Sequence, residues 1–149
     1  MNKYKFKAEL VVPPVKIERM FFAVSSFIFH PAKLPDDKEK MMNIQISFES
    51  DISRVDEENK TVEIQVTIQS VPEQDKKIEF AVMCVGIYTW IGEAFDENAV
   101  KSIYQWGASV QTSSIREHII TQTSRGPYNV PSPIPIGLIH IGIETPPDN

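Results

Sequence analysis

The stretch IREHIITQTSRGPYNVPSPIPIGL, residues 115–138, guides the interpretation of the whole chain. It opens with the spacing of a helix, because Ile115 and Ile119 lie four residues apart and therefore on one face. The helix is predicted to end at the Arg-Gly-Pro sequence 125–127. These residues supply a cation for the C-terminal end, a residue that tolerates positive φ, and a ring that cannot continue the hydrogen bonding.

Beyond this stop, the chain continues as an extended apolar segment that is stiffened by proline. The prolines are Pro127, Pro131, Pro133 and Pro135, and the large apolar residues among and after them are Tyr128, Val130, Ile134, Ile136 and Leu138. Proline holds the backbone extended and cannot continue a helix. The segment is therefore expected to lie as a strap against another part of the protein.

Three motifs in this region resemble the C-terminal part of the SecB protein-export chaperones. They are Ile115-Arg116-Glu117-x-Ile119, Ser124-Arg125-Gly126-x-Tyr128 and Pro135-Ile136-x-Leu138. The resemblance extends over residues 15–138 and is carried by its last third. It implies a four-stranded antiparallel sheet followed by two C-terminal helices, assembled as a dimer of dimers. It also implies an ATP-independent cytosolic chaperone whose clients are unfolded or extended polypeptides.

The resemblance also implies roles for two sets of residues. The positions that lie at the contact between SecB dimers correspond to Ile78, Phe80, Val82 and Cys84, all apolar, so a homo-oligomer, dimer or tetramer, is expected. The acidic positions at which the family docks the translocation motor correspond to Val24, Ile28 and Ala81. None of these three is acidic, which counts against the motor as a partner of this chain.

Length and composition indicate one domain, residues 1–149, with an apolar content of 42%. A net charge of −5 without a basic stripe argues against nucleic-acid binding. Cys84 is the single cysteine, so a disulfide framework is excluded. It is predicted to be a small buried apolar residue. The longest apolar run, 20–29, is shorter than the roughly 18 residues that span a bilayer, and the N-terminus lacks the apolar core of a signal peptide. No membrane insertion and a cytoplasmic location are therefore expected.

Alternating apolar and polar residues predict a series of antiparallel strands. The predicted strands are 15–29, 44–48, 62–68 and 78–91, with a fifth, N-terminal strand segment at 4–10 within residues 1–13. The acidic stretch 51–60 is predicted to be a solvated turn between two strands.

Two helices are predicted after the strands. The first begins with Asp96 as its N-cap and carries apolar residues with helical spacing. Trp106-Gly107 is predicted to break it, and a main helix follows over 108–124. Residues 144–149 form a tail. The order, strands first and helices last, is typical of an α+β domain with a four-stranded or five-stranded sheet.

A catalytic interpretation finds no support in the residue spacing. His30, His118 and His140 lie in unrelated segments, without the spacing of zinc ligands, and no phosphate-binding glycine loop occurs. Cys84 has no neighbouring cation in the sequence to lower the pKa of its thiol. The protein is therefore predicted not to be an enzyme and to need no metal or other cofactor.

An excess of large apolar residues is the strongest functional signal. The segments 20–29, 83–90 and 104–106 carry aromatics and methionines at both strand parities. One interpretation is that helices cover one sheet face and a partner subunit the other. The alternative is a groove that binds extended apolar peptide, because methionine and aromatic surfaces repack around many partners. The candidate groove residues are Phe22, Phe27, Phe29, Met83, Tyr88, Trp90 and Trp106.

Two functions of different classes follow from these patterns. The first is a SecB-like chaperone that holds non-native polypeptide clients, in protein export or a related role. The second is an oligomeric scaffold with the SecB fold that is dedicated to one partner, such as an antitoxin-type client. Tolerance of unrelated unfolded clients separates the two.

Overall fold

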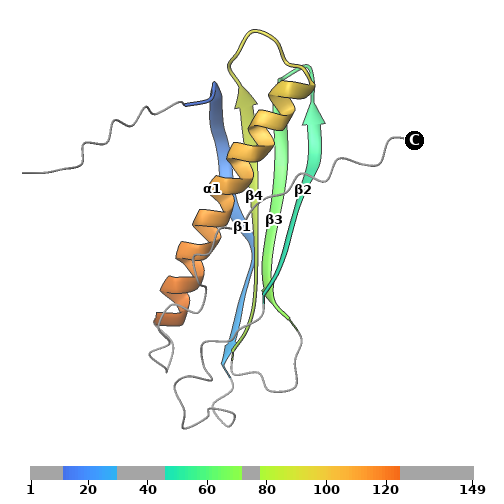
Figure 1. The fold of residues 1–149 in the computed structure, drawn as a ribbon. Coiled ribbons are helices and arrows are strands. Elements are labelled where there is room, and N and C mark those ends of the chain that lie inside the picture. Colours follow the sequence, from blue (N-terminus) through green and yellow to red (C-terminus); the bar gives the residue numbers. More distant parts are fainter. Residues whose placement is uncertain (1–11, 30–45, 72–77, 125–149) are drawn as a thin grey trace, which may run out of the picture.

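The computed structural model describes residues 12–29, 46–71 and 78–124. Its elements are β1 (Val15–Phe29), β2 (Ile46–Asp56), β3 (Thr61–Ser70), β4 (Ile78–Trp90) and α1 (Glu97–Ser124). The strands form one antiparallel sheet in the order β1-β4-β3-β2, and α1 runs obliquely across one face (Figure 1). The predicted four-stranded antiparallel sheet is confirmed, whereas the segment 4–10 and the strap 127–138 lie outside the described residues.

The alternation of the sequence accounts for the central strands. In β3, the side chains of Val62, Ile64, Val66 and Ile68 are buried, and the residues between them are half-buried. β2 is longer than predicted, because the polar and acidic residues after Phe48, which were read as the approach to a turn, continue to pair with β3 as far as Asp56. A bulge between Ile52 and Arg54 then shifts the register of the last part of β2 against β3.

A single continuous helix, α1, replaces the two helices that were predicted. Asp96 is its N-cap, as predicted, and its carboxylate accepts a hydrogen bond of 3.0 Å from the amide of Ala99. The predicted break at Trp106-Gly107 is wrong. Gly107 lies on the buried side of the helix, where an added Cβ would come within 2.9 Å of side-chain atoms of Ile64 and Tyr88. The glycine therefore permits close helix–sheet packing, at a propensity cost of only about 1 kcal/mol.

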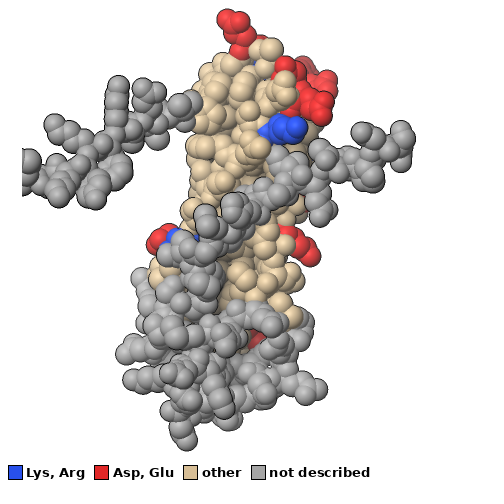
Figure 2. Space-filling view, in the orientation of Figure 1, with Lys and Arg blue, Asp and Glu red and all other residues tan. Residues whose placement is uncertain are grey.

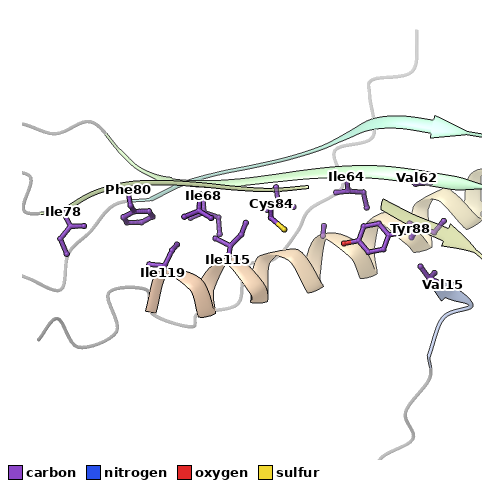
Figure 3. Close-up of a cluster of buried hydrophobic side chains, with 14 residues drawn as sticks. Val15, Val62, Ile64, Ile68, Ile78, Phe80, Cys84, Tyr88, Ile115 and Ile119 are labelled. Atoms are coloured by element: carbon purple, nitrogen blue, oxygen red, sulfur yellow. The ribbon is translucent and has the colours of Figure 1, made fainter. Parts of the chain in front are cut away.

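The hydrophobic core lies between α1 and the sheet face that it covers (Figure 3). Ile103, Ile115 and Ile119 of the helix are fully buried there. They pack against the inward-facing side chains of β3 and β4, such as Ile68 and Phe80. Burial of each large aliphatic side chain contributes about 1.5–3 kcal/mol, so this layer holds the helix on the sheet.

Candidate functional site

Strand β1 is an edge strand with apolar side chains on both faces. Only β4 pairs with it among the described residues, so its other edge has no strand neighbour in that part of the chain. The helix packs mainly on β3 and β4 and reaches β1 at few positions. A long edge strand that carries exposed apolar residues is a site where another polypeptide can bind.

The register with β4 shows which residues of β1 face the helix. Phe22 lies opposite Cys84, Phe27 opposite Phe80, and Phe29 opposite Ile78. The partners of these phenylalanines are core residues, so the phenylalanines lie on the helix side of the sheet. We call Ile17, Met20, Phe22, Phe27 and Phe29 the helix-side surface.

This surface is incompletely covered. Met20 and Phe22 keep 38% and 39% of their surface exposed, whereas Phe27 and Phe29 are half-buried against the core. The strand register places Phe22, Phe27 and Phe29 on the same side of the sheet. Binding of a peptide by them stays a prediction.

His118 of α1 borders this surface. Its ring stacks on Phe22 with a centroid distance of 4.4 Å and meets the edge of Phe27 at 5.7 Å. Its Nε2 atom lies 2.7 Å from the Ser25 hydroxyl, within hydrogen-bonding distance. One turn earlier on the helix, the Ser114 hydroxyl lies 3.8 Å from the sulfur of Met20. The sequence reading assigned no role to His118, because its contacts come from residues more than ninety positions away.

The opposite face of the sheet carries a second apolar surface. Val24 lies opposite Met83 on this face, and Ile28 lies opposite Glu79. Val24 and Ile28 are exposed by 43% and 48%. We call Phe21, Val24, Ile28, Met83 and Ile87 the outer surface. It contains Met83, a predicted peptide-binding residue. The other residues of the outer surface were not predicted to bind peptide, because each bulge in β1 reverses which of its alternating residues face the helix.

Charged residues flank the outer surface near the start of β1. The guanidinium carbon of Arg19 lies 4.8 Å from the ring centroid of Phe21. Glu18 accepts a hydrogen bond of 3.0 Å from the Thr89 hydroxyl and pairs with Lys16 at 3.3 Å. The hydrogen bond from Thr89, followed by that from Lys16, lowers the pKa of the Glu18 carboxyl, so this carboxylate is charged at neutral pH.

Tyr88, a predicted peptide-binding residue, belongs to the core instead. Its side chain is 0% exposed, and its ring lies so close over Gly86 that a Cβ there would come within 2.7 Å of ring carbons. A residue without exposed surface cannot contact a client in this fold. The prediction of a binding role for Tyr88 is corrected for this reason.

The Tyr88 hydroxyl instead belongs to a buried polar network. It donates a hydrogen bond of 2.7 Å to Oε1 of Gln111 and lies 3.2 Å from the carbonyl oxygen of Gly107. The Gln111 amide nitrogen donates to the carbonyl oxygens of Ile64 and Cys84 at 3.1 and 2.8 Å. Burial raises the pKa of the Tyr88 hydroxyl and of the Cys84 thiol, so both groups stay protonated at neutral pH. The network joins α1 to β3 and β4.

The two predicted tryptophans lie on the helix side at the far end of the sheet. Trp106 of α1 meets the Tyr88 ring edge-on with a centroid distance of 5.9 Å. Trp90 lies opposite Val15, a core residue, and its indole nitrogen is buried with no hydrogen-bond partner among residues 12–29, 46–71 and 78–124. Both are half-buried and pack against the core. They lie next to Tyr88 and Val15, at the opposite end of β4 from Phe80, the partner of Phe27.

The predicted interface residues Ile78, Phe80, Val82 and Cys84 are also core residues. Each is at most 6% exposed and belongs to the core cluster that also contains Ile115 and Ile119 of α1 in the same subunit. Figure 3 shows Phe80 and Cys84 between the sheet and the helix. The sequence reading placed them at a contact between subunits, and in this respect it is corrected. Assembly into an oligomer stays a prediction.

Acidic side chains gather at the end of the sheet where α1 begins. In Figure 2 this end carries most of the visible Asp and Glu residues, whereas uncharged residues dominate the rest of the described face. Glu57 and Glu58 are exposed in the β2–β3 turn, as predicted for a solvated turn, although β2 extends as far as Asp56. The Lys60 ammonium joins this turn to the β4–α1 connection through the carbonyl oxygens of Gly92 and Glu93, at 3.5 and 3.4 Å.

Within residues 12–29, 46–71 and 78–124, no three His, Cys, Asp or Glu side chains lie close enough together to hold a metal ion. The described helix is not apolar enough along its length to cross a membrane.

The sequence matches no family model and no curated protein. Among solved structures, the chain is similar to the SecB-like chaperone of Mycobacterium tuberculosis, solved in complex with a ChAD peptide from the HigA1 antitoxin. That alignment has a TM-score of 0.57 and 12% identity, and it covers 80% of this chain and 88% of the mycobacterial one. A protein of unknown function from Streptococcus agalactiae aligns over 76% of this chain and 90% of its own, with 15% identity and a TM-score of 0.38.

The likeness to the mycobacterial chaperone shows the fold. This chain has a SecB-like fold, and the resemblance expected from the C-terminal motifs is confirmed at that level.

Proposed function

We propose that this protein is an ATP-independent chaperone that holds non-native or extended polypeptides against strand β1. The observation that carries the proposal is an edge strand with exposed, large apolar residues on both faces, within a SecB-like fold. The proposed contacts are the helix-side surface, around Met20 and Phe22, and the outer surface, around Val24 and Ile28. The activity is binding without catalysis.

The energetics fit a protein that binds and releases clients. Complete burial of a large apolar side chain contributes about 1.5–3 kcal/mol. Met20, Phe22, Val24 and Ile28 are 38% to 48% exposed, so a client that covers one of them gains about 1 kcal/mol. Each subunit therefore binds weakly. A dimer or tetramer, which we include in the proposal, raises the apparent affinity through multivalency without any new type of contact.

A second candidate is a scaffold with the SecB-like fold that is dedicated to one partner. It is favoured by the mycobacterial structure, in which the similar chain carries a peptide from an antitoxin. A second observation also favours the dedicated scaffold. Val24 and Ile28, at positions matched to the motor-docking site of the family, are exposed but apolar, so they lack the acidic groups that dock the motor. Docking to a translocation motor is not part of either proposal.

The test combines light scattering with an aggregation assay. The purified full-length chain is mixed, without ATP, with a reduced and permanently unfolded client, and turbidity is followed. We expect an oligomer that suppresses aggregation at near-stoichiometric amounts. A monomer that leaves aggregation unchanged would refute the chaperone proposal. Several unrelated clients are compared, because suppression limited to one partner favours the dedicated scaffold.

A further inference from the structure

The outer surface lies on two neighbouring strands and is open in the described part of the chain. Phe21, Val24 and Ile28 of β1 are 38%, 43% and 48% exposed, and Met83 and Ile87 of β4 are half-buried beside them. Within residues 12–29, 46–71 and 78–124, α1 packs on the opposite face of the sheet, and no element lies over the outer surface. Exposed apolar surfaces with a polar border commonly bind other polypeptides.

The dimensions of the outer surface match those of one helix. Neighbouring strands lie about 4.8 Å apart, so two strands with their side chains present a width of about 10 Å, close to the diameter of a helix. Residues 21–28 span about 20 Å, a length that a helix of about 14 residues covers.

The backbone pairing of β4 also favours a helix over an extended segment on this face. β4 is hydrogen-bonded to β1 on one side and to β3 on the other, so it offers no unpaired edge to an added strand. An extended segment laid over the face would hold its own amides and carbonyls unpaired against apolar side chains, which is costly. A helix satisfies its backbone internally, and α1 already packs in this way on the opposite face.

Carboxylates follow the border of the outer surface on the β2 side. The strand register aligns two rows of outward-facing residues across the sheet, Val24–Met83–Thr67–Glu49 and Phe21–Val85–Gln65–Asp51. Each row runs from an exposed apolar residue on β1, through a neutral polar residue on β3, to an exposed carboxylate on β2. Neither carboxylate forms an ion pair with a described residue.

The cations of the outer face lie away from these two rows. The described ones, Lys16, Arg19 and Arg54, occupy rows nearer the end of the sheet where α1 begins. The β2 border of the outer surface is therefore negatively charged beside Val24 and Phe21, and it complements a basic partner.

We propose that the outer surface binds an amphipathic helix of another polypeptide, with its apolar side against β1 and β4 and with lysine or arginine residues on the flank that faces β2. Glu49 and Asp51 lie two strands from β4, about 10 Å away. A long basic side chain and a carboxylate side chain bridge this gap together. The inference rests on the proposed function, because it names the class of polypeptide that this surface holds.

Titration of the full-length chain with synthetic peptides, followed by fluorescence anisotropy, tests the proposal. The probe is an amphipathic helical peptide of leucine and lysine, about 18 residues long and so slightly longer than the outer surface. One matched peptide has glutamate in place of lysine, and another has proline at its centre. We expect the leucine–lysine peptide to bind and both matched peptides to bind about tenfold or more weakly, because the first is repelled by the carboxylates and the second cannot form a continuous helix.

Two pairs of variants locate the binding site of the leucine–lysine peptide. Val24→Ser should weaken binding about fivefold, whereas Val55→Ser, an equally exposed position on β2 that pairs with a core residue of β3, should leave it unchanged. Glu49→Gln should weaken binding about two- to fivefold. Glu58→Gln removes the same charge in the β2–β3 turn and should leave binding nearly unchanged. Circular dichroism checks that each variant is folded.

Several outcomes would overturn the proposal. Absence of binding to the wild type would show that the outer surface is closed to such a partner. Equal binding of the glutamate peptide would refute the charge argument, and equal binding of the proline peptide would refute the helical occupant. Equal weakening by Val55→Ser would place the site elsewhere. A dimer of the chain alone that Val24→Ser dissociates, seen by light scattering, would identify a second copy as the occupant.

The peptide titration contains no aggregating client, so it separates this inference from the proposed function. A chain that suppresses client aggregation without binding the leucine–lysine peptide would refute the inference alone. A chain that binds the peptide through Val24 and Glu49 but leaves aggregation unchanged would support the inference and refute the chaperone proposal.

Discussion

Replacing Tyr88 by phenylalanine tests whether this residue is structural, as the fold indicates, or part of a client site. The hydroxyl is fully buried and donates to Oε1 of Gln111 at 2.7 Å. The Tyr88→Phe variant keeps the ring, so it leaves no large cavity, but it removes the donor from a buried acceptor. Loss of one partner of a buried hydrogen bond costs about 1–3 kcal/mol. We therefore expect the free energy of unfolding to fall by that amount.

The measurement is urea unfolding followed by circular dichroism at neutral pH. For a chain of this size, each kcal/mol also lowers the Tm by about 2–4 °C. Tyr104→Phe is the matched control, because its hydroxyl bonds to the Ser50 hydroxyl at a half-buried position. The control should lose only about 0.5–1.5 kcal/mol, since water can replace the missing partner more easily.

Client binding by folded Tyr88→Phe should equal that of the wild type. An unchanged free energy of unfolding, or a loss smaller than that of Tyr104→Phe, would refute the argument from the buried network. A loss of client binding at unchanged stability would return Tyr88 to the client site and contradict its burial.

Three further predictions concern the surface, the helix contact and pH. Phe22→Ser should weaken suppression of client aggregation while the free energy of unfolding changes by less than about 1 kcal/mol. Val55→Ser, at a 43% exposed position on β2, is the control, and equal weakening by it would contradict a specific surface. Gly107→Val should destabilise the fold by about 1–3 kcal/mol in thermal unfolding, because the added Cβ would lie 2.9 Å from side-chain atoms of Ile64 and Tyr88. A variant as stable as the wild type would show that the helix is not packed this closely on the sheet. The raised pKa values of Cys84 and Tyr88 mean that the folded state holds these protons longer than the unfolded state, so stability should be constant between pH 7 and about pH 8.5 and fall progressively above it. Urea unfolding between pH 7 and 11 checks this, and a rise in stability over that range would contradict it.

The sheet could be predicted from local patterns. The bounds of β1 agree with the prediction, and the end of β4 differs from it by one residue. Both strands are long apolar runs bounded by turn residues, a pattern that can be read from the sequence. The N-cap at Asp96 was also predictable, since capping is a contact between near neighbours in sequence. The end of β2 was missed because residues 49–56 have the polar and acidic composition of a turn, although they pair with β3.

The single helix could not be predicted, because the reason for Gly107 lies on other elements. Within the sequence, Trp106-Gly107 has the composition of a helix break. In the structure, the missing side chain makes room for Ile64 and Tyr88 of the sheet. Tertiary packing outweighs a propensity cost of about 1 kcal/mol, and a local pattern cannot show this.

The candidate site divides in the same way. The sequence alone determined that segment 20–29 carries more large apolar residues than a small core needs, since this depends only on composition and spacing. Only the tertiary structure decided which of them are available. The edge position of β1 and its two bulges leave Phe22 and Val24 exposed on opposite faces, whereas the central position of β4 buries Tyr88 and Phe80 beneath α1. Exposure depends on strand order, register and helix placement, which arise from contacts between distant parts of the chain.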